Sequence, residues 1–305
     1  FDGQVYCLGS LTSGMILVYN QDVFDLFGAP YPSAQDPMSI EEYHNLIIRL
    51  TQKSDRVEER IWGGEAAPYF TWMDPGTHFS PDGRVVTGFL NDEPTTDAYQ
   101  WLADAYRSGA SITVEEAESL DQTPLARLIA GRQATALVDS AEALPALEQS
   151  DVRWGAAAVP TERKGDPKWS SNRTDGLGVT KISQHPDTAI DFLVFFANYG
   201  NQLRLERGEM PLNVKLAEQW ASGSDQRRQV FEALNHDRAY PFIPGYIETT
   251  QLFWDAWAQM TEKGTPAKEA LDEIAILMQE TLDRTWVEFE AIQSSGGGNE
   301  IPAQP

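Results

Sequence analysis

Short apolar segments of strand length alternate with longer amphipathic segments along most of this chain. Residues 15–19, 134–138 and 154–159 are predominantly apolar runs bounded by polar residues, glycine or proline, as buried strands are. Residues 214–221 and 266–292 repeat their apolar positions at helical spacing. Chains in which strands and helices alternate fold into stacked α/β layers. The sequence therefore predicts an α/β fold.

Local signals place the individual elements. Ser39 and Glu42 form the pattern of a capping box, which predicts that a helix begins at this serine. Thr96 is predicted to cap another helix, which ends at Gly109. The remaining expected helices cover residues 21–27, 125–130, 227–234 and 247–263, with a further helix starting at Pro186. The other expected strands cover residues 5–8, 60–63 and 177–180, and the polar segment 9–14 is expected to join strands 5–8 and 15–19.

The composition argues against two classes of protein. The chain has 305 residues with 46 acidic and 23 basic side chains, a net charge of -23. Nucleic-acid binding is not expected, because contacts to phosphate require lysine and arginine. No stretch approaches the roughly 18 continuous apolar residues of a membrane-spanning helix. Apolar residues make up 41% of the chain, enough to bury real cores, and the length suits two domains of roughly 150 residues each.

The cysteine and histidine content predicts no disulfide, metal site or cofactor. Cys7 is the only cysteine, and it lies in an apolar run where a small buried hydrophobic side chain is expected. The four histidines have no metal-ligand spacing.

Residues 68–72 concentrate three aromatic rings in a segment that is neither helical nor strand-like. Tyr69, Phe70 and Trp72 lie between a glycine pair and a Pro-Gly turn. Rigid aromatic surface on a loop suits a ligand with an apolar face and polar edges, such as a sugar ring. A small satellite core under the loop is the alternative.

Several motifs occur in a consistent order along nearly the whole chain. They are DGQVYCL at 2–8, LVYNQDVF at 17–24 with GAPYP at 28–32, LIAGRQATA at 128–136, RWGA at 153–156, HPDTA at 185–189 and TPAKEAL at 265–271. This series resembles the sugar-binding branch of the extracellular solute-binding proteins of ABC importers, family 1. Two positions depart from that pattern: residues 139–142 lack a Gly-x-Trp, and Ala67 replaces an acid.

The resemblance implies a two-lobed periplasmic-binding-protein-like fold of type II. Family members carry further residues before the point at which this chain starts, so the N-terminal lobe is expected to be incomplete. Residues 1–12 and 159–204 are assigned to the remnant of that lobe. Residues 13–158 and 205–292 are assigned to the C-terminal lobe, and the Ser-, Gly- and Pro-rich residues 293–305 to a disordered tail.

The resemblance also implies ligand-binding residues. Tyr69 is expected to stack on a sugar ring, with Trp72 supporting it or contacting the ligand, and Phe70 packing. The hydroxyl groups of Ser10 and Thr12 are candidates where the chain first crosses the hinge, although turn capping is an alternative.

Further candidates follow later strands. Ser140 and Glu142 occupy the position of the missing tryptophan, where Glu142 either accepts hydrogen bonds from sugar hydroxyls or is a solvated residue at a helix start. Trp169 precedes a loop in which Arg173 and Asp175 either contact vicinal hydroxyls or form a surface ion pair. Tyr246 is expected to face the ligand. Phe79, beside His78, is a weaker candidate, and Trp254 and Trp257 are expected in the core.

These residues predict a non-catalytic receptor that closes around a sugar by a hinge motion. The resemblance implies delivery to an ABC permease in the membrane, a monomer, and a periplasmic or extracellular location, with a lipid anchor on a missing N-terminus as an option. A glycerol phosphodiester or a peptide remains an alternative ligand. A glycoside hydrolase and a structural glycan-binding module remain alternative classes, although no carboxylate pair is marked for hydrolysis.

Overall fold

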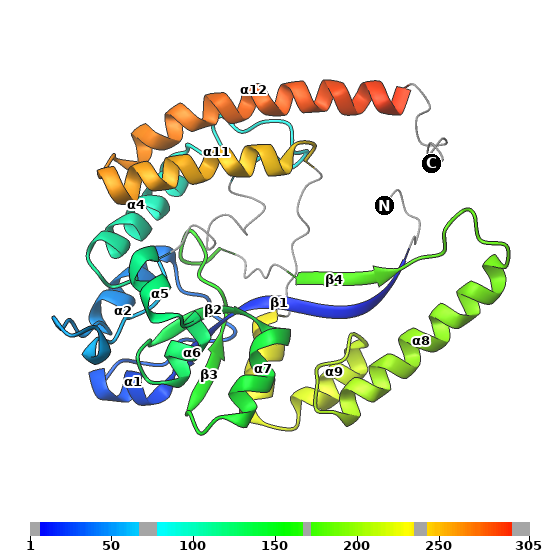
Figure 1. Cartoon of the computed structure of the whole chain (residues 1–305), viewed down its shortest axis with the longest axis horizontal. Helices are drawn as coiled ribbons and strands as arrows, with labels where there is room; N and C mark the ends of the chain where they lie inside the picture. The colour runs from blue at the N-terminus through cyan, green and yellow to red at the C-terminus, as the bar shows by residue number, and fades with distance from the viewer. Residues whose placement is uncertain (1–6, 67–77, 167–171, 235–242, 295–305) are drawn as a thin grey trace.

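The computed structural model describes residues 7–66, 78–166, 172–234 and 243–294. For residues 10–13, 114, 172–175 and 293 it describes the backbone alone. The expected contributions of residues 1–6 and the tail beyond residue 294 lie outside the described residues. Helices and strands alternate as the α/β prediction requires, in the order shown in Figure 1.

The first half of the chain builds most of the sheet and the helices beside it. Its elements are β1 (Leu8–Asn20), α1 (Gln21–Phe27), α2 (Ile40–Arg49), η1 (Val57–Glu59), α4 (Glu93–Arg107), α5 (Val114–Leu120), α6 (Pro124–Ile129), β2 (Thr135–Asp139), α7 (Ser140–Gln149) and β3 (Trp154–Ala157). The second half adds β4 (Asn172–Leu177), α8 (Pro186–Glu206), α9 (Val214–Ala221), α10 (Asp225–Leu234), α11 (Tyr246–Ala258), the π-helical turn η2 (Gln259–Lys263) and α12 (Ala267–Ser294).

β1 is the central strand and pairs with all the other described strands. Its second half lies antiparallel between β2 and β3, and its first half pairs antiparallel with β4. The prediction of two strands joined by a polar segment was wrong, because residues 9–14 are part of one continuous strand. Since their backbone groups find partners on β4, the Gly- and Ser-rich sequence does not interrupt the strand. β1 therefore runs without a break across the boundary predicted between the two lobes.

Alternate side chains of β1 face two different cores. Leu17 and Tyr19 pack with α2, α4, α11 and α12, whereas Ile16 and Val18 pack with α6, α7, α9 and α10. This follows from the two-residue period of a strand. In Figure 1, α11 and α12 lie along one side of the molecule, α8 and α9 lie on the opposite side, and β1 runs between them. Trp257 is buried and Trp254 packs against the first core, as expected.

Several predicted helix ends are confirmed by their caps. Ser39 accepts from the N–H of Glu42, and the Glu42 carboxylate accepts from the N–H of Ser39, so the capping box is complete. Gly28 ends α1 in the left-handed conformation at φ 59°. The prediction for Thr96 was wrong, because the helix begins earlier: Asp92 caps it by accepting from the N–H of Thr95.

The predictions of a strand over residues 177–180 and of a buried Cys7 were wrong. Residues 178–180 are not a strand; the strand is β4, which ends at Leu177. Cys7 is exposed rather than buried, at the position just before β1. α12 continues to Ser294, two residues into the predicted tail.

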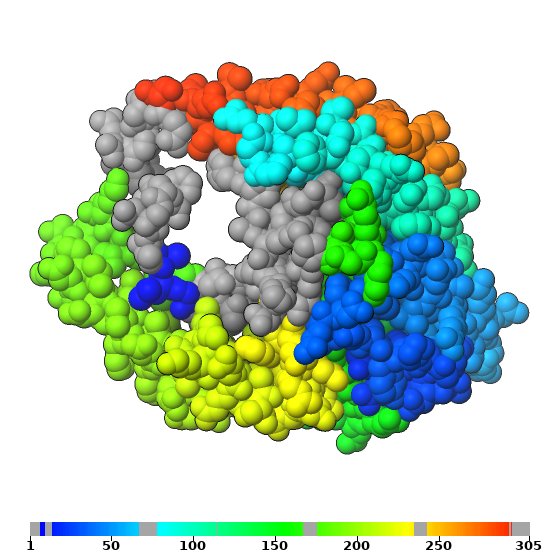
Figure 2. Space-filling view, turned by 180° about the vertical axis from the view of Figure 1, so that it is seen from behind, coloured from blue at the N-terminus to red at the C-terminus, as the bar shows by residue number. Residues whose placement is uncertain are grey.

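α8 lies at one edge of the molecule, which Figure 2 shows from behind. It spans 21 residues and none of them is buried. Phe195 is 61% exposed, and its ring stacks on Tyr199 at 5.7 Å between centroids. Such a large exposed apolar face is typical of a surface that other protein covers.

Candidate functional site

Part of the predicted site falls outside what the structure describes. Tyr69, Trp72 and Trp169 belong to segments 67–77 and 167–171, which are outside the described residues. Ser10, Thr12, Arg173 and Asp175 are placed through their backbone.

The structure brings two of the predicted segments together. β1 and β4 are paired with Thr12 opposite Thr174. In the same pair, Leu11 lies opposite Asp175 and Ser13 lies opposite Arg173. The prediction that residues 172–176 form a loop was wrong, because antiparallel pairing with β1 makes them a strand. Candidate residues that are more than 150 positions apart in sequence thus become neighbours on adjacent strands.

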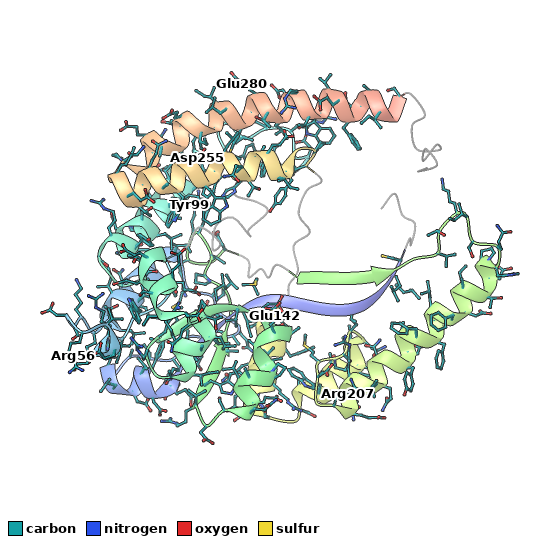
Figure 3. The ribbon with its side chains drawn as sticks, in the orientation of Figure 1. Arg56, Tyr99, Glu142, Arg207, Asp255 and Glu280 are labelled. Atoms are coloured by element: carbon teal, nitrogen blue, oxygen red, sulfur yellow. The ribbon has the colours of Figure 1, made fainter. Side chains whose placement is uncertain are left out.

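Ser140 and Glu142 lie at the start of α7, directly after the end of β2. Asp139 caps this helix by accepting from the N–H of Ala141 at 3.0 Å. The buried Ser140 hydroxyl accepts from the N–H of Gly14 at 3.2 Å, which ties α7 to β1. Glu142 is exposed in the first turn and lies beside β1 near the middle of the molecule in Figure 3.

A pocket of about 560 Å³ adjoins these residues, between α7 and the turn that connects α8 to α9. Arg204 and Glu209 form an ion pair of 3.2 Å at its wall. Arg207, at the junction of α8 and α9 in Figure 3, also lines it. The lining comprises Ser140, Ala141, Glu142, Leu144, Pro145, Glu148, Gln149, Arg204, Arg207, Gly208, Glu209 and Met210. Carboxylates, guanidinium groups and apolar side chains therefore meet in one cavity of ligand size.

Tyr246 is the first residue of α11, as its position after Pro-Gly predicts. Gly245 precedes it in the left-handed conformation at φ 77°. Tyr246 is partly buried against the first core, and this burial raises the pKa of its phenol. Figure 1 shows α11 apart from the paired strands β1 and β4.

His78 and Phe79 are core residues, so the suggestion that Phe79 contacts a ligand was wrong. Phe79 is 3% exposed. The His78 Nε2 lies 2.7 Å from the Tyr99 hydroxyl, and its ring stacks on Phe253 at 5.6 Å. Complete burial lowers the pKa of His78 to about 3. Packing against the rings of Tyr99 and Phe253 explains the burial of His78, and Phe79 packs in the same core.

Glu65 is a candidate that the sequence analysis missed. Its Oε2 accepts from the N–H of Leu137 on β2 at 3.0 Å. Burial raises the pKa of this carboxyl group to about 7, opposed by the hydrogen bond from Leu137 and by the charge of Arg127. The available signal was an acidic residue between the Gly63-Gly64 pair and the aromatic segment.

The raised pKa of Glu65 predicts a stability that falls with pH. An acid with pKa 4.5 when unfolded and about 7 when folded keeps its proton in the folded state after the unfolded chain has lost it. The free energy of unfolding should therefore decrease as pH rises from 4.5 to about 7, by up to about 3 kcal/mol, and then level off. Urea unfolding across this range should show the decrease in the wild type. Glu65→Gln should abolish this contribution; an unchanged slope in the variant would assign it to other groups.

The described residues show neither a membrane-spanning helix nor a cluster of metal-binding side chains. Within the described ranges, no helix has the length and apolarity needed to cross a membrane. The same residues contain no cluster of three or more histidine, cysteine or acidic side chains suited to a metal ion.

Solved structures similar to this chain define its fold. An ABC substrate-binding protein from Listeria monocytogenes, in complex with cycloalternan, has a TM-score of 0.74 at 18% identity, covering 93% of this chain and 73% of its own. The cyclic alpha-maltosyl-1,6-maltose binding protein from Arthrobacter globiformis has a TM-score of 0.68 at 17% identity, covering 93% and 74%. The GacH receptor of Streptomyces glaucescens, also known in complex with acarbose, has a TM-score of 0.66 at 17% identity, covering 93% and 72%.

These likenesses confirm the type II periplasmic-binding-protein fold. This chain spans about three quarters of the length of each of these structures. No curated protein sequence matches it. A family model, described as bacterial extracellular solute-binding protein, matches residues 2–203, about two thirds of the chain. This chain belongs to the bacterial extracellular solute-binding proteins.

Proposed function

We propose that this protein is the sugar-binding component of an ABC importer and that it catalyses no reaction. The family match over residues 2–203 carries the proposal. The carbohydrate class rests on similar structures whose descriptions name cycloalternan, acarbose and cyclic maltosyl-maltose. The aromatic segment 68–72 adds support, because sugar rings stack on flat side chains.

Hinge closure is the proposed mechanism. Ligand binds one lobe first and then bridges to the second, because the closed form makes contacts that the open form lacks. β1 crosses the proposed lobe boundary, and β4 pairs with its first half, so these two strands carry the hinge. The closed form then delivers its ligand to a membrane permease. The protein acts as a monomer in a periplasmic or extracellular location. A lipid anchor that holds the protein at the membrane is compatible with this function.

We assign residues 1–12 and 159–204 to one lobe, and residues 13–158 and 205–292 to the other. α8, in the first of these lobes, has an exposed apolar face, and this chain covers 73% of the Listeria monocytogenes structure. The proposed ligand contacts are Tyr69, Trp72, Ser10, Thr12, Ser140, Glu142, Trp169, Arg173, Asp175 and Tyr246.

The test is a thermal-shift and calorimetric screen against glucose, maltotriose, mannotriose, cycloalternan and acarbose. At least one of these is expected to raise the melting temperature. Tyr69→Ala should weaken its binding by about tenfold or more, since loss of a stacked aromatic ring costs on the order of 1.5 kcal/mol. Tyr199→Ala, an exposed tyrosine on α8, is the matched control and should leave affinity unchanged.

Three results would contradict the proposal in different ways. If no sugar binds but a glycerol phosphodiester or a peptide does, the ligand class is wrong. Appearance of shortened products during incubation with an oligosaccharide would indicate a glycoside hydrolase. Sugar binding without any effect of gene loss on sugar uptake would favour a structural glycan-binding module.

A further inference from the structure

The segment that ends at Glu65 runs alongside β2 and separates from it at this residue. The N–H of Thr135 donates to the carbonyl of Gly63 at 3.1 Å, as in a parallel pair of strands. Two residues further along β2, the N–H of Leu137 would bond to the carbonyl of residue 65 if that pairing continued. It donates instead to the Glu65 side chain at 3.0 Å. A carboxylate thus replaces the backbone acceptor at the point where the two segments separate.

The backbone of Glu65 is fixed from a different direction. The hydroxyl of Tyr43, on α2, donates to the Glu65 carbonyl at 3.1 Å and lies 3.2 Å from the Glu65 nitrogen, whose N–H it accepts. The N–H of the next residue donates to the Ser111 hydroxyl at 3.0 Å. These contacts hold the Cα of Glu65 while Leu137 holds its Oε2. The carboxyl group consequently has one preferred orientation.

Only one carboxylate oxygen of Glu65 is occupied by these contacts. Among the described residues, no hydrogen bond to its Oε1 is found, and the residue is partly exposed. Tyr43 and Arg127 are the titratable groups that face it, from α2 and α6. The Arg127 Nε donates to the Gln133 Oε1 at 2.8 Å. Among the described residues, Arg127 and Glu65 form no ion pair. Within the part of the chain that the structure describes, Oε1 is therefore an oriented acceptor without a donor.

The position of this acceptor is that of a ligand site. Residue 62 forms a parallel bridge with residue 133, so the two segments run in the same direction. Their carboxyl ends lie at one edge, and ligands of α/β proteins bind beyond such edges. Glu65 follows one segment there, and Ser140 and Glu142 follow the other.

We propose that Glu65 binds a hydroxyl group of the sugar ligand through Oε1 while its Oε2 remains bound to Leu137. This inference rests on the proposed function and adds a specificity-determining acid to it. Such an acceptor favours a neutral sugar with a free hydroxyl at that position and disfavours an anionic substituent there.

A pH dependence of affinity follows. A sugar hydroxyl donates best to the ionised carboxylate, so binding favours loss of the proton. The pKa of Glu65 near 7 places this change within the neutral range. Affinity should therefore increase as pH rises through 7, by about tenfold between about pH 5.5 and 8.5.

Glu65→Gln tests the proposal by calorimetry with whichever sugar of the panel above binds the wild type most tightly. Glutamine keeps an acceptor for Leu137 and is expected to leave the chain folded, as circular dichroism will verify. Its Kd at pH 8.5 should be about tenfold weaker, because hydrogen bonds to charged groups contribute about 1.5 kcal/mol or more. The variant's Kd should also be independent of pH. Glu118→Gln, an exposed acid on α5, should retain the wild-type Kd and its pH profile.

The outcomes separate this inference from the proposed function. Sugar binding with an equal Kd and pH profile in Glu65→Gln would show that Glu65 has a structural role only, and the inference would fall while the proposed function stands. If no sugar of the panel binds the wild type, the proposed function fails, and the assignment of Glu65 falls with it.

Discussion

Gly63→Ala is expected to destabilise the protein by about 3 kcal/mol or more. A Cβ atom at this position would lie 1.8 Å from the carbonyl oxygen of Ile47 and 2.5 Å from its carbon. Both are main-chain atoms of α2, so no side chain can rotate away. The N–H of Gly63 also donates to the carbonyl of Ala110 at 3.1 Å, which prevents the segment from shifting freely.

Urea unfolding followed by tryptophan fluorescence would measure this effect. Gly200→Ala is the matched control, because nothing lies within 4 Å of a Cβ built there and the residue is inside α8. The control should be stabilised by about 0.5–1 kcal/mol, as alanine is a better helix former. Equal unfolding midpoints for Gly63→Ala and the wild type would show that α2 does not approach residue 63 this closely.

Phe253→Ala is expected to cost about 3–5 kcal/mol. Phe253 is 2% exposed, and its ring lies 5.2 Å from that of Tyr99 and 5.6 Å from that of His78. Removing the ring leaves a cavity beside two aromatic side chains that cannot collapse into it without losing their own hydrogen bond. α11 would then lose the contact of Phe253 with the Tyr99 ring of α4.

The same measurement on Phe192→Ala provides the comparison. Phe192 is 57% exposed on α8, so its removal should change the free energy of unfolding by less than about 0.5 kcal/mol in this chain. A similar loss for both phenylalanines would mean that α8 is covered in solution, and that the surface around it is an interface.

The features that the sequence predicted best are local. The capping box of Ser39 and Glu42 needs only four consecutive residues, and Gly28 ends α1 through its own backbone conformation. Apolar periodicity predicted α9 at its observed limits and placed Trp257 in the core. Because caps and apolar periodicity depend on residues close in sequence, they can be predicted without knowledge of the fold.

The mistaken predictions involve partners distant in sequence. Residues 9–14 look like a linker, and β4 looks like a loop, until the two segments pair with each other. Cys7 is exposed although its neighbours in sequence are apolar, because burial depends on packing in the folded chain. Phe79 is a weak ligand-binding candidate in sequence and is a core residue in the fold, because it packs in one cluster with buried side chains of α4 and α11.

Glu65 shows the same limit within the candidate site. In sequence it is one of 46 acidic residues, with a glycine pair before it and the aromatic segment after it. Its fixed orientation arises from Leu137, more than 70 positions away, and from Tyr43. Burial among these groups, rather than any motif, raises its pKa.

The sequence by itself determined the α/β class, several helix limits, the family resemblance and the aromatic segment, because these depend on composition, periodicity and short ordered motifs. The tertiary structure decided the single continuous β1, the pairing of residues 11–13 with 173–175, the burial of His78 and the carboxylate that meets β2 at Leu137. Those features arise from hydrogen bonds and packing between segments that the chain brings together only when it folds, so no local pattern encodes them.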